Sequence, residues 1–512
     1  MNEDGDGSGK REVSVQSDPA GHDLSEHAQA IEVRETHSGI VVLCGDRALK
    51  AKKPVVTDFL DFGSVEKREE ACRREVRLNR RLAPQAYLGV GHVCTPGEAP
   101  EPLVVMARLP EKYKLTNLLK ASGPDGEEDV VAEIGRLAAL IARFHHDADR
   151  GPEISRQGTS TAVWDRWQAN LREIRELGPP ERIGDLLDEI GVLAEEFIAG
   201  RDEIFDERIV EGRVVDGHGD LLAEDTFCMP DGPLVLDCLD FDSRLRSVDG
   251  VDDIAFLAMD IEYRGHRRLA DLLVSAYLTE ANDSAPRSLI DQYIAYRAIV
   301  RAKVDLIRAT QGDADGAGRA LSHALLARDH LRSAQVRLGL VGGLPGTGKS
   351  TVSRALADEV GAQLFSSDAV RHELRRAGAL TGTAGDFGAG LYSAANTRIV
   401  YETLLSRARQ HLIRGESVIL DASWTDAEFR RLAHSVADSC HAATIEMRCV
   451  VDPQVAVRRI IERADAHHSD ATPEIAAEMA ARADEHWPDA VDIDTGGAVE
   501  NAVESAMRHW RR

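Results

Sequence analysis

The pattern of apolar and polar positions changes near residue 335. This change divides the chain into two segments with different orders of predicted strands and helices. Residues 31–55 and 101–110 have strand-like patterns, and the first stretch contains a Gly45-Asp46 turn. Later stretches place apolar residues at helical spacing. The predicted helices before residue 335 cover 65–83, 129–147, 162–177, 182–201, 266–280, 286–309 and 319–334. Strands first and helices later, with short strands and loops over 213–241, predict an α+β fold.

After residue 335, strand-like and helix-like segments alternate one for one. The predicted strands are 336–342, 362–367, 417–422 and 443–450, and the predicted helices are 349–360, 397–414, 426–437 and 453–464. This alternation predicts an α/β fold with a parallel sheet and crossover helices. We therefore expect a disordered tail at 1–30, a first domain at 31–335 and a second domain at 336–512.

Composition limits the partners and the compartment. The net charge of −25 argues against nucleic acid and membrane surfaces as partners, although a local basic groove would be compatible with it. The seven cysteines are scattered and form no CxxC pair, which argues against a disulfide framework and suits a reducing cytoplasm. The sequence contains no run of about 18 apolar residues, so no transmembrane helix is predicted.

The strongest motif lies between a predicted strand and a predicted helix in the second domain. It comprises Gly343, Leu344, Pro345, Gly346, Thr347, Gly348, Lys349 and Ser350, followed by Thr351. This G-x-x-x-x-G-K-[ST] pattern in this context predicts a loop whose backbone N–H groups surround phosphate oxygens. Lys349 should reach the β- and γ-phosphates, and Ser350 should ligate Mg²⁺. The motif therefore predicts binding of ATP with Mg²⁺.

Polar residues elsewhere in the second domain are candidates for the rest of such a site. Asp368 and Arg371 follow the second strand, where the alternative is a helix-capping aspartate with a surface arginine. Asp421 ends a strand at a position suited to the Mg²⁺ shell. Arg459 and Arg463 lie four residues apart on one helical face, where plain surface arginines are the alternative.

The segment 336–512 resembles the small P-loop kinases of the gluconate kinase, chloramphenicol phosphotransferase and zeta-toxin type. The resemblance implies that Asp368 orients or deprotonates an acceptor hydroxyl and that Arg371 stabilises an anionic group. It also implies that Arg459 and Arg463 belong to a lid that closes over the transferring phosphoryl group. It leaves the acceptor unidentified.

A second set of carboxylates in the first domain has the spacing of a phosphotransfer site. Asp220 follows His218, Asp225 comes five residues after Asp220, and Asp237 closes an apolar strand twelve residues later. Kinase-fold phosphotransferases use this H-x-D-x-x-x-x-N pattern, followed by an aspartate on the next strand. One carboxylate accepts the proton of the attacking hydroxyl, and the others hold the metal. We therefore expect Asp220 to be the base in a catalytic loop with His218, and Asp225 and Asp237 to bind Mg²⁺.

Residues 31–335 resemble the aminoglycoside phosphotransferase superfamily. The resemblance extends to a D-x-x-x-D-[IL]-A pattern at Asp249 and Asp253, which we expect to brace loops. It implies that Lys50 or Lys52 contacts the α/β-phosphates and that Glu75 aims the lysine; Lys50 fits the pattern better. Asp225 stands where the superfamily has asparagine. His145 and His146, at the end of helix 129–147, are expected to be core or surface histidines.

The sequence as a whole predicts an ATP- and Mg²⁺-dependent phosphotransferase with two separate ATP sites and small hydroxylated molecules as acceptors. No obligate protein partner is inferred. Two alternatives remain open: an ATP-binding regulatory protein in which one domain has little turnover, and a nucleic-acid end kinase, against which the acidic charge argues.

Overall fold

The computed structural model describes residues 31–35, 39–56, 61–94, 96–97, 99–122, 128–381, 390–464, 473–482 and 487–511. The expected tail, 1–30, lies outside the described residues. By its internal contacts the chain divides into two compact units, one ending at Glu111 and the other beginning at Lys112. The proposed boundary at 335 falls within the second unit, in a two-residue connection between a helix and a strand.

The first unit is an antiparallel sheet with one helix against it. Its strands are β1 (Glu32–Glu35), β2 (Gly39–Cys44), β3 (Arg47–Lys52), β4 (Tyr87–Val93) and β5 (Glu101–Ala107), and its helix is α1 (Val65–Asn79). The strand order is β1-β2-β3-β5-β4. Gly45 has a positive φ of 58°, as the tight turn between β2 and β3 requires. α1 turns Ala71, Cys72 and Val76 inward and is capped by Ser64.

The first part of the second unit is mainly helical. Its helices are α2 (Leu115–Ser122), α3 (Glu128–Asp147), α4 (Pro152–Arg156), α5 (Ser160–Glu176), α6 (Glu181–Ala199), α7 (Asp202–Val210), α8 (Ser243–Arg246), α9 (Gly250–Tyr263), α10 (Arg267–Glu280), α11 (Arg287–Thr310) and α12 (Gly316–Ala334). Two small antiparallel pairs accompany them: β6 (Val214–Asp216) with β9 (Ser247–Asp249), and β7 (Thr226–Met229) with β8 (Gly232–Val235). α9 is buried from Gly250 to Ile261 and packs against α10 and α11.

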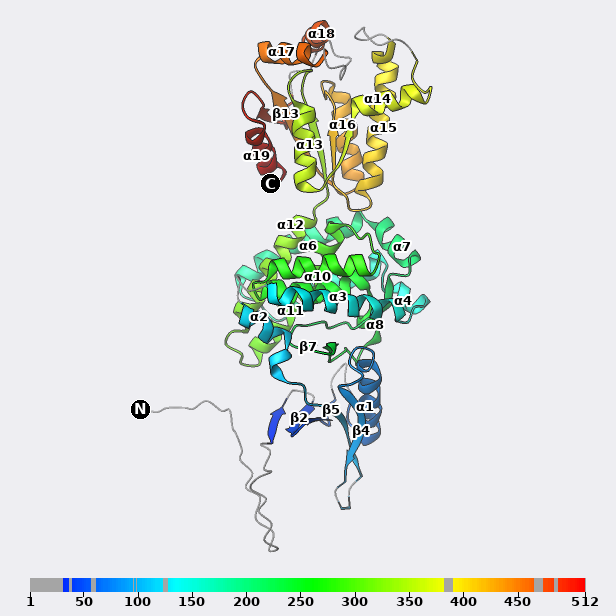
Figure 1. Cartoon of the computed structure of the whole chain (residues 1–512), viewed down its shortest axis with the longest axis vertical. Coiled ribbons are helices and arrows are strands. Elements are labelled where there is room, and N and C mark those ends of the chain that lie inside the picture. Colours follow the sequence, from blue (N-terminus) through cyan, green and yellow to red (C-terminus); the bar gives the residue numbers. More distant parts are fainter. Residues whose placement is uncertain are drawn as a thin grey trace, which may run out of the picture. The chain divides into compact units, whose positions relative to one another are not determined.

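The remaining part of the second unit is a parallel α/β layer structure, as predicted (Figure 1). Its strands are β10 (Arg337–Gly342), β11 (Gln363–Ser366), β12 (Val418–Asp421), β13 (Ala443–Val450) and β14 (Val491–Asp494), in the order β11-β12-β10-β13-β14. Its helices are α13 (Lys349–Val360), α14 (Ser367–Arg376), α15 (Ala394–Leu412), α16 (Ala427–Ser439), α17 (Pro453–Ala464), α18 (Pro473–Arg482) and α19 (Val499–Trp510).

Two apolar clusters cover the two faces of this parallel sheet. One joins strand residues to Leu404 of α15 and Ala433 of α16, and the other joins them to Leu356 of α13 and Ala506 of α19. The central strands β10 and β12 are therefore buried on both faces, which explains their short continuous apolar runs. Of the helices that the structure describes, none has the length and hydropathy to cross a membrane.

Candidate active sites

The glycine-rich loop joins the central strand β10 to the N-terminus of α13. Gly343, Gly346 and Gly348 have φ values of 138°, 83° and 86°, which other residues rarely adopt. A Cβ on Gly346 would lie 2.4 Å from the carbonyl oxygen of Ala456 in α17. The loop therefore needs glycine both for its backbone shape and for its close packing against α17.

Asp421, Ser350 and Lys349 meet beside this loop. Asp421 ends β12, the strand that pairs with β10, and its residue is only 3% exposed. Burial raises the pKa of Asp421, whereas the charge of Lys349 and a hydrogen bond from Ser350 lower it. Its Oδ1 atom is buried without a hydrogen-bond partner. An orphaned carboxylate oxygen next to a hydroxyl suits a hydrated Mg²⁺ ion, so these residues fit the predicted metal.

Asp368 and Arg371 both belong to α14 but differ in exposure. The Asp368 side chain is 62% exposed and accepts a hydrogen bond of 3.0 Å from Nη1 of Arg371. Arg371 is buried, lies 4.4 Å above the ring centre of Tyr392, and its Nε atom has no partner. The cap of α14 is Ser366. The alternative of a capping aspartate with a surface arginine therefore does not describe this helix.

Arg459 of α17 reaches the glycine-rich loop through Thr495. Its Nη2 donates to the carbonyl oxygen of Thr495 at 2.8 Å, and the Thr495 hydroxyl donates to the carbonyl oxygen of Thr347 at 2.6 Å. Arg459 is thus more than a surface residue. The predicted partner Arg463 also lies in α17, but its side chain is outside the described residues. Thr495 was not predicted, because it follows the short, half-polar strand β14.

The catalytic-loop motif lies between β6 and β7, where a buried network holds its backbone. Asp253 of α9 accepts hydrogen bonds from the backbone N–H groups of His218 (2.6 Å) and Gly219 (2.9 Å). His218 is 1% exposed, and its Nε2 donates to the carbonyl oxygen of Leu236 at 3.1 Å. Asp220 follows directly. His218 therefore joins the loop to the segment before Asp237 instead of facing solvent.

Asp237 influences the other two predicted carboxylates. Burial raises the pKa of Asp220 to about 6; Arg301 opposes the rise and Asp237 adds to it. Burial and then the charges of Asp237, Glu224 and Asp220 raise the pKa of Asp225 well above its usual value. Asp237 holds a positive φ of 61°, a strained conformation of the kind found at functional sites.

This crowding of carboxylates suits a bound cation. No preformed group of three His, Cys, Asp or Glu metal ligands occurs in the part of the chain that the structure describes. Mg²⁺ sites in phosphotransferases need only one or two carboxylates, because water and substrate phosphates supply the other ligands. Asp225 and Asp237 therefore fit the predicted metal.

In the first unit, Lys50 and Lys52 of β3 both pair with Glu75 of α1. The distances are 2.9 Å from Lys50 Nζ to Glu75 Oε1 and 2.5 Å from Lys52 Nζ to Glu75 Oε2. The Lys50 side chain is 21% exposed and that of Lys52 only 7%. Lys50 is thus more accessible to a ligand, and Lys52 is more deeply paired.

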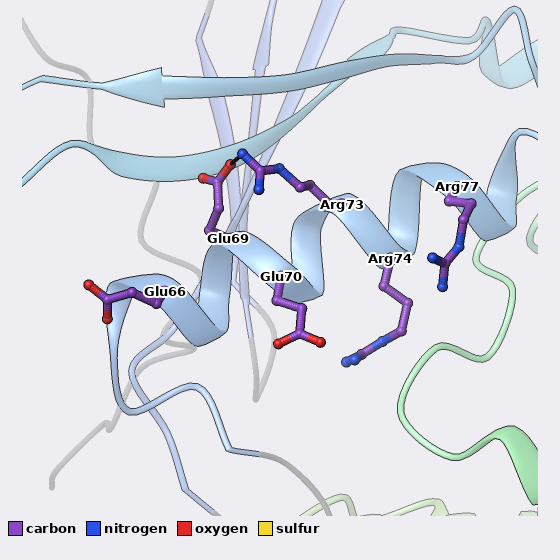
Figure 2. A pocket seen from close by; sticks show the side chains of 6 residues that line it. All are labelled: Glu66, Glu69, Glu70, Arg73, Arg74 and Arg77. Carbon is purple, nitrogen blue, oxygen red and sulfur yellow. Dashed lines mark ion pairs between the residues drawn. The ribbon is translucent and has the colours of Figure 1, made fainter.

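The first unit also has a surface pocket on α1, at residues other than Glu75 (Figure 2). It is lined by Glu66, Glu69, Glu70, Arg73, Arg74 and Arg77. The acidic residues lie toward the N-terminus and the basic residues toward the C-terminus, the order that the helix dipole favours. The helix dipole therefore explains the order of acidic and basic side chains along α1. None of the predicted site residues lines the pocket.

Comparison with known proteins found a matching family model and similar solved structures. A family model described as an AAA domain matches residues 338–486. A gluconokinase from Sinorhizobium meliloti is 14% identical, with a TM-score of 0.26, over 34% of this chain and 91% of that one. A choline/ethanolamine kinase family protein from Mesorhizobium loti is 15% identical, with a TM-score of 0.37, over 60% of this chain and 95% of that one.

Relatives of nearly equal length exist in mycobacteria. An uncharacterized protein of Mycobacterium bovis and one of Mycobacterium tuberculosis are each 48% identical over 483 residues, 94% of this chain and 95% of theirs. The expected succession of an α+β part and a P-loop α/β part is confirmed by the fold and by the AAA domain match. The chain belongs to the family of these mycobacterial proteins.

Proposed function

We propose that the protein is an ATP- and Mg²⁺-dependent phosphotransferase with two separate ATP sites, each acting on a small hydroxylated molecule. The observation that carries the proposal is the glycine-rich loop with Ser350 beside the orphaned Asp421 oxygen. A buried carboxylate oxygen without a hydrogen-bond partner is costly unless a ligand satisfies it. A metal-bound nucleotide phosphate is the ligand that this loop geometry supports best.

In the P-loop part, backbone N–H groups and Lys349 hold the phosphates, and Ser350 and Asp421 hold the metal. Mg²⁺, when bound, neutralises charge on the phosphate oxygens. Asp368 orients the acceptor hydroxyl and accepts its proton, while Arg371 keeps the carboxylate in place through the 3.0 Å hydrogen bond. Arg459 stabilises charge that develops on the transferring group.

In the segment 31–335, which we call the kinase-like part, Asp220 is the base. A pKa of about 6 leaves it deprotonated at neutral pH, yet basic enough to accept a hydroxyl proton in the transition state. Asp225 and Asp237 hold Mg²⁺, and Lys50 or Lys52 contacts the α/β-phosphates. The strand lysine and the catalytic loop lie in different units of the chain.

A screen of small hydroxylated metabolites tests this function. The full chain is incubated with γ-labelled ATP, Mg²⁺ and metabolite fractions, and labelled products are identified by the added mass of one phosphoryl group. Lys349→Ala should remove the products of the P-loop part and Asp220→Asn those of the kinase-like part. Labelled products that persist in the double variant would refute both assignments. ATP binding without any labelled product would favour a regulatory role.

A further inference from the structure

A buried chain of polar side chains leads from helix α10 to the catalytic loop of the kinase-like part. Asp253 is fully buried, and its two oxygens accept hydrogen bonds from the backbone N–H groups of the two residues that precede Asp220. A Cβ on Gly217 would lie 2.5 Å from Asp253 Oδ2, so the loop is packed directly on this carboxylate. The orientation of the Asp253 carboxylate therefore sets the path of the backbone that carries Asp220.

His145, near the end of α3, holds the same carboxylate from the other side. Its ring is 5% exposed; Nε2 lies 3.1 Å from Asp253 Oδ2 and Nδ1 lies 2.8 Å from the hydroxyl oxygen of Tyr277. An ionised carboxylate only accepts hydrogen bonds, so Nε2 carries the proton. In the neutral ring Nδ1 then accepts a hydrogen bond from the Tyr277 hydroxyl group, and this bond fixes the orientation of the ring.

Gly250 leaves just enough room for this arrangement. A Cβ at that position would lie 2.4 Å from the Tyr277 hydroxyl oxygen and 3.1 Å from His145 Nδ1. Tyr277 is itself 2% exposed. Each member of the chain is thus confined by packing as well as by hydrogen bonds, which is what a fixed geometry at the loop requires.

We propose that His145, oriented by Tyr277, is a positioning residue that locks Asp253 and through it the catalytic loop, so that Asp220 meets the acceptor hydroxyl correctly. This inference rests on the proposed phosphotransferase function of the kinase-like part. It goes beyond the expectation of a core histidine, because it assigns the ring a specific effect on turnover.

A pocket of about 320 Å³ lies beside the His145 ring and allows a specific test. It is lined by His145, Tyr277 and Gly250, among others. Arg150, also in its wall, already donates to the carbonyl oxygens of His145, His146, Ala148 and Gly212. Arg150 is therefore already satisfied by the protein, and we use added imidazole as the probe that would replace a missing His145 ring from this pocket.

The first experiment measures Mg²⁺-dependent ATP hydrolysis by the full chain carrying Lys349→Ala, so that the kinase-like part is observed. His145→Leu removes the donor to Asp253 and should lower kcat by between about 10- and 100-fold, the cost of a misplaced catalytic group. KM for ATP should stay within about twofold, since ATP binding does not use this network. His145→Gln, whose amide can replace Nε2–H, should keep most of the activity.

Rescue and hydrogen exchange separate positioning from general stability. Imidazole should restore kcat in His145→Ala, and Tyr277→Phe should lower kcat by several-fold while leaving the fold intact. The amides of His218 and Gly219 should exchange faster in His145→Leu but not in His145→Gln. Unchanged amide exchange together with unchanged kcat would overturn the proposal.

Failure of the proposed phosphotransferase function can be distinguished from failure of the positioning role of His145. If the parental chain hydrolyses no ATP, the phosphotransferase assignment of this part is wrong, and amide exchange alone then decides whether His145 holds the loop. If His145→Leu does not fold, His145→Ala with imidazole and Tyr277→Phe give the decision: no rescue and no loss of kcat would reject the positioning role.

Discussion

At the scale of residues, Asp220 and Asp237 interact electrostatically but have different proposed roles. Asp237 raises the pKa of both Asp220 and Asp225. A metal ligand acts in the bound ground state, whereas a base acts only as the hydroxyl proton leaves. The two roles can therefore be separated by measuring binding and turnover on the same variants.

Asp237→Asn should weaken binding of Mg²⁺-ATP to the kinase-like part by at least about tenfold, because a charged metal ligand is lost. Asp220→Asn should leave that binding within about threefold and lower turnover by about 100-fold or more, because only the base is lost. Calorimetric titration with a non-hydrolysable ATP analogue and steady-state assays, both in the Lys349→Ala background, check this. Equal loss of nucleotide by both variants would contradict the division of roles. Asp225→Asn, a conservative ligand change, should retain metal binding.

The sequence predicted site residues that belong to a recognisable motif, and it missed residues whose only signal is a partner far away in sequence. Lys349 and Ser350 could be placed because the motif and its strand–helix context lie within a few residues of each other. Thr495 and His145 could not be assigned roles, since their partners Thr347 and Asp253 are far away in sequence. Their side chains acquire a function only when the fold brings these segments together.

At the scale of elements, His330 ties three helices of the second unit together. It lies in α12 with its Nδ1 2.8 Å from Asp291 Oδ1 of α11 and its Nε2 2.9 Å from Glu262 Oε2 of α9. The ring is 2% exposed. Burial lowers the pKa of His330, but the hydrogen bonds and charges of the two carboxylates outweigh it and raise the pKa to about 9.

This network predicts a defined pH dependence of stability. Because the folded pKa is above the unfolded value of about 6.5, the stabilisation is complete below pH 6.5 and is lost as the pH rises through 9. The free energy of unfolding should fall by about 3 kcal/mol over that range. His330→Gln should remove most of this fall, which urea unfolding from pH 6 to 9.5 would detect. A fall of the same size in His330→Gln would show that other groups cause it.

Elements with helical apolar spacing or a compact apolar run were predictable, and elements without such a pattern were not. α3, α11 and the strand β10 agree with the prediction to within a few residues. α9 was read only as a motif, because it is buried on all sides and shows no amphipathic stripe. β4 contains two glycines in seven residues, which weakens its strand signal.

At the scale of the whole molecule, the helical part and the P-loop part of the second unit are joined at a seam formed by Gly200, Arg201, Cys440 and His441. Arg201 is 1% exposed and donates from Nη1 to the carbonyl oxygen of Cys440 at 2.6 Å. A Cβ on Gly200 would lie 2.3 Å from that same oxygen. Burial lowers the pKa of Arg201 to about 10, so the guanidinium remains charged at neutral pH.

The seam lies away from the phosphate loop. Cys440 and His441 precede β13, so they lie at the amino ends of the parallel strands, whereas the phosphate loop follows the carboxyl end of β10. A second contact, from the Ser288 hydroxyl to the carbonyl oxygen of Gly415 at 2.6 Å, also lies at the amino ends, just before β12. The two parts can therefore be firmly joined without closing the P-loop site.

Arg201→Met should destabilise the chain by about 1–3 kcal/mol, because it leaves the buried Cys440 carbonyl without its donor. Arg414→Met is the matched control: Arg414 pairs with Glu207 across the same seam at 2.7 Å, but its side chain is 56% exposed, so the loss should stay below about 1 kcal/mol. Differential scanning calorimetry of both variants checks this, and the Arg201 variant should separate the unfolding of the two parts. Equal effects of the two variants would contradict a seam held by the buried arginine.

The central claim is that one chain carries two independent sites for Mg²⁺-ATP, and the number of nucleotides bound per chain tests it most directly. Equilibrium titration with a non-hydrolysable ATP analogue and Mg²⁺ should give two sites in the parental protein. Lys349→Ala and Asp237→Asn should each leave one site with unchanged affinity and weaken the other by at least about tenfold, and the double variant should bind weakly at both. A single site in the parental chain, or a loss of both sites in either single variant, would contradict the account.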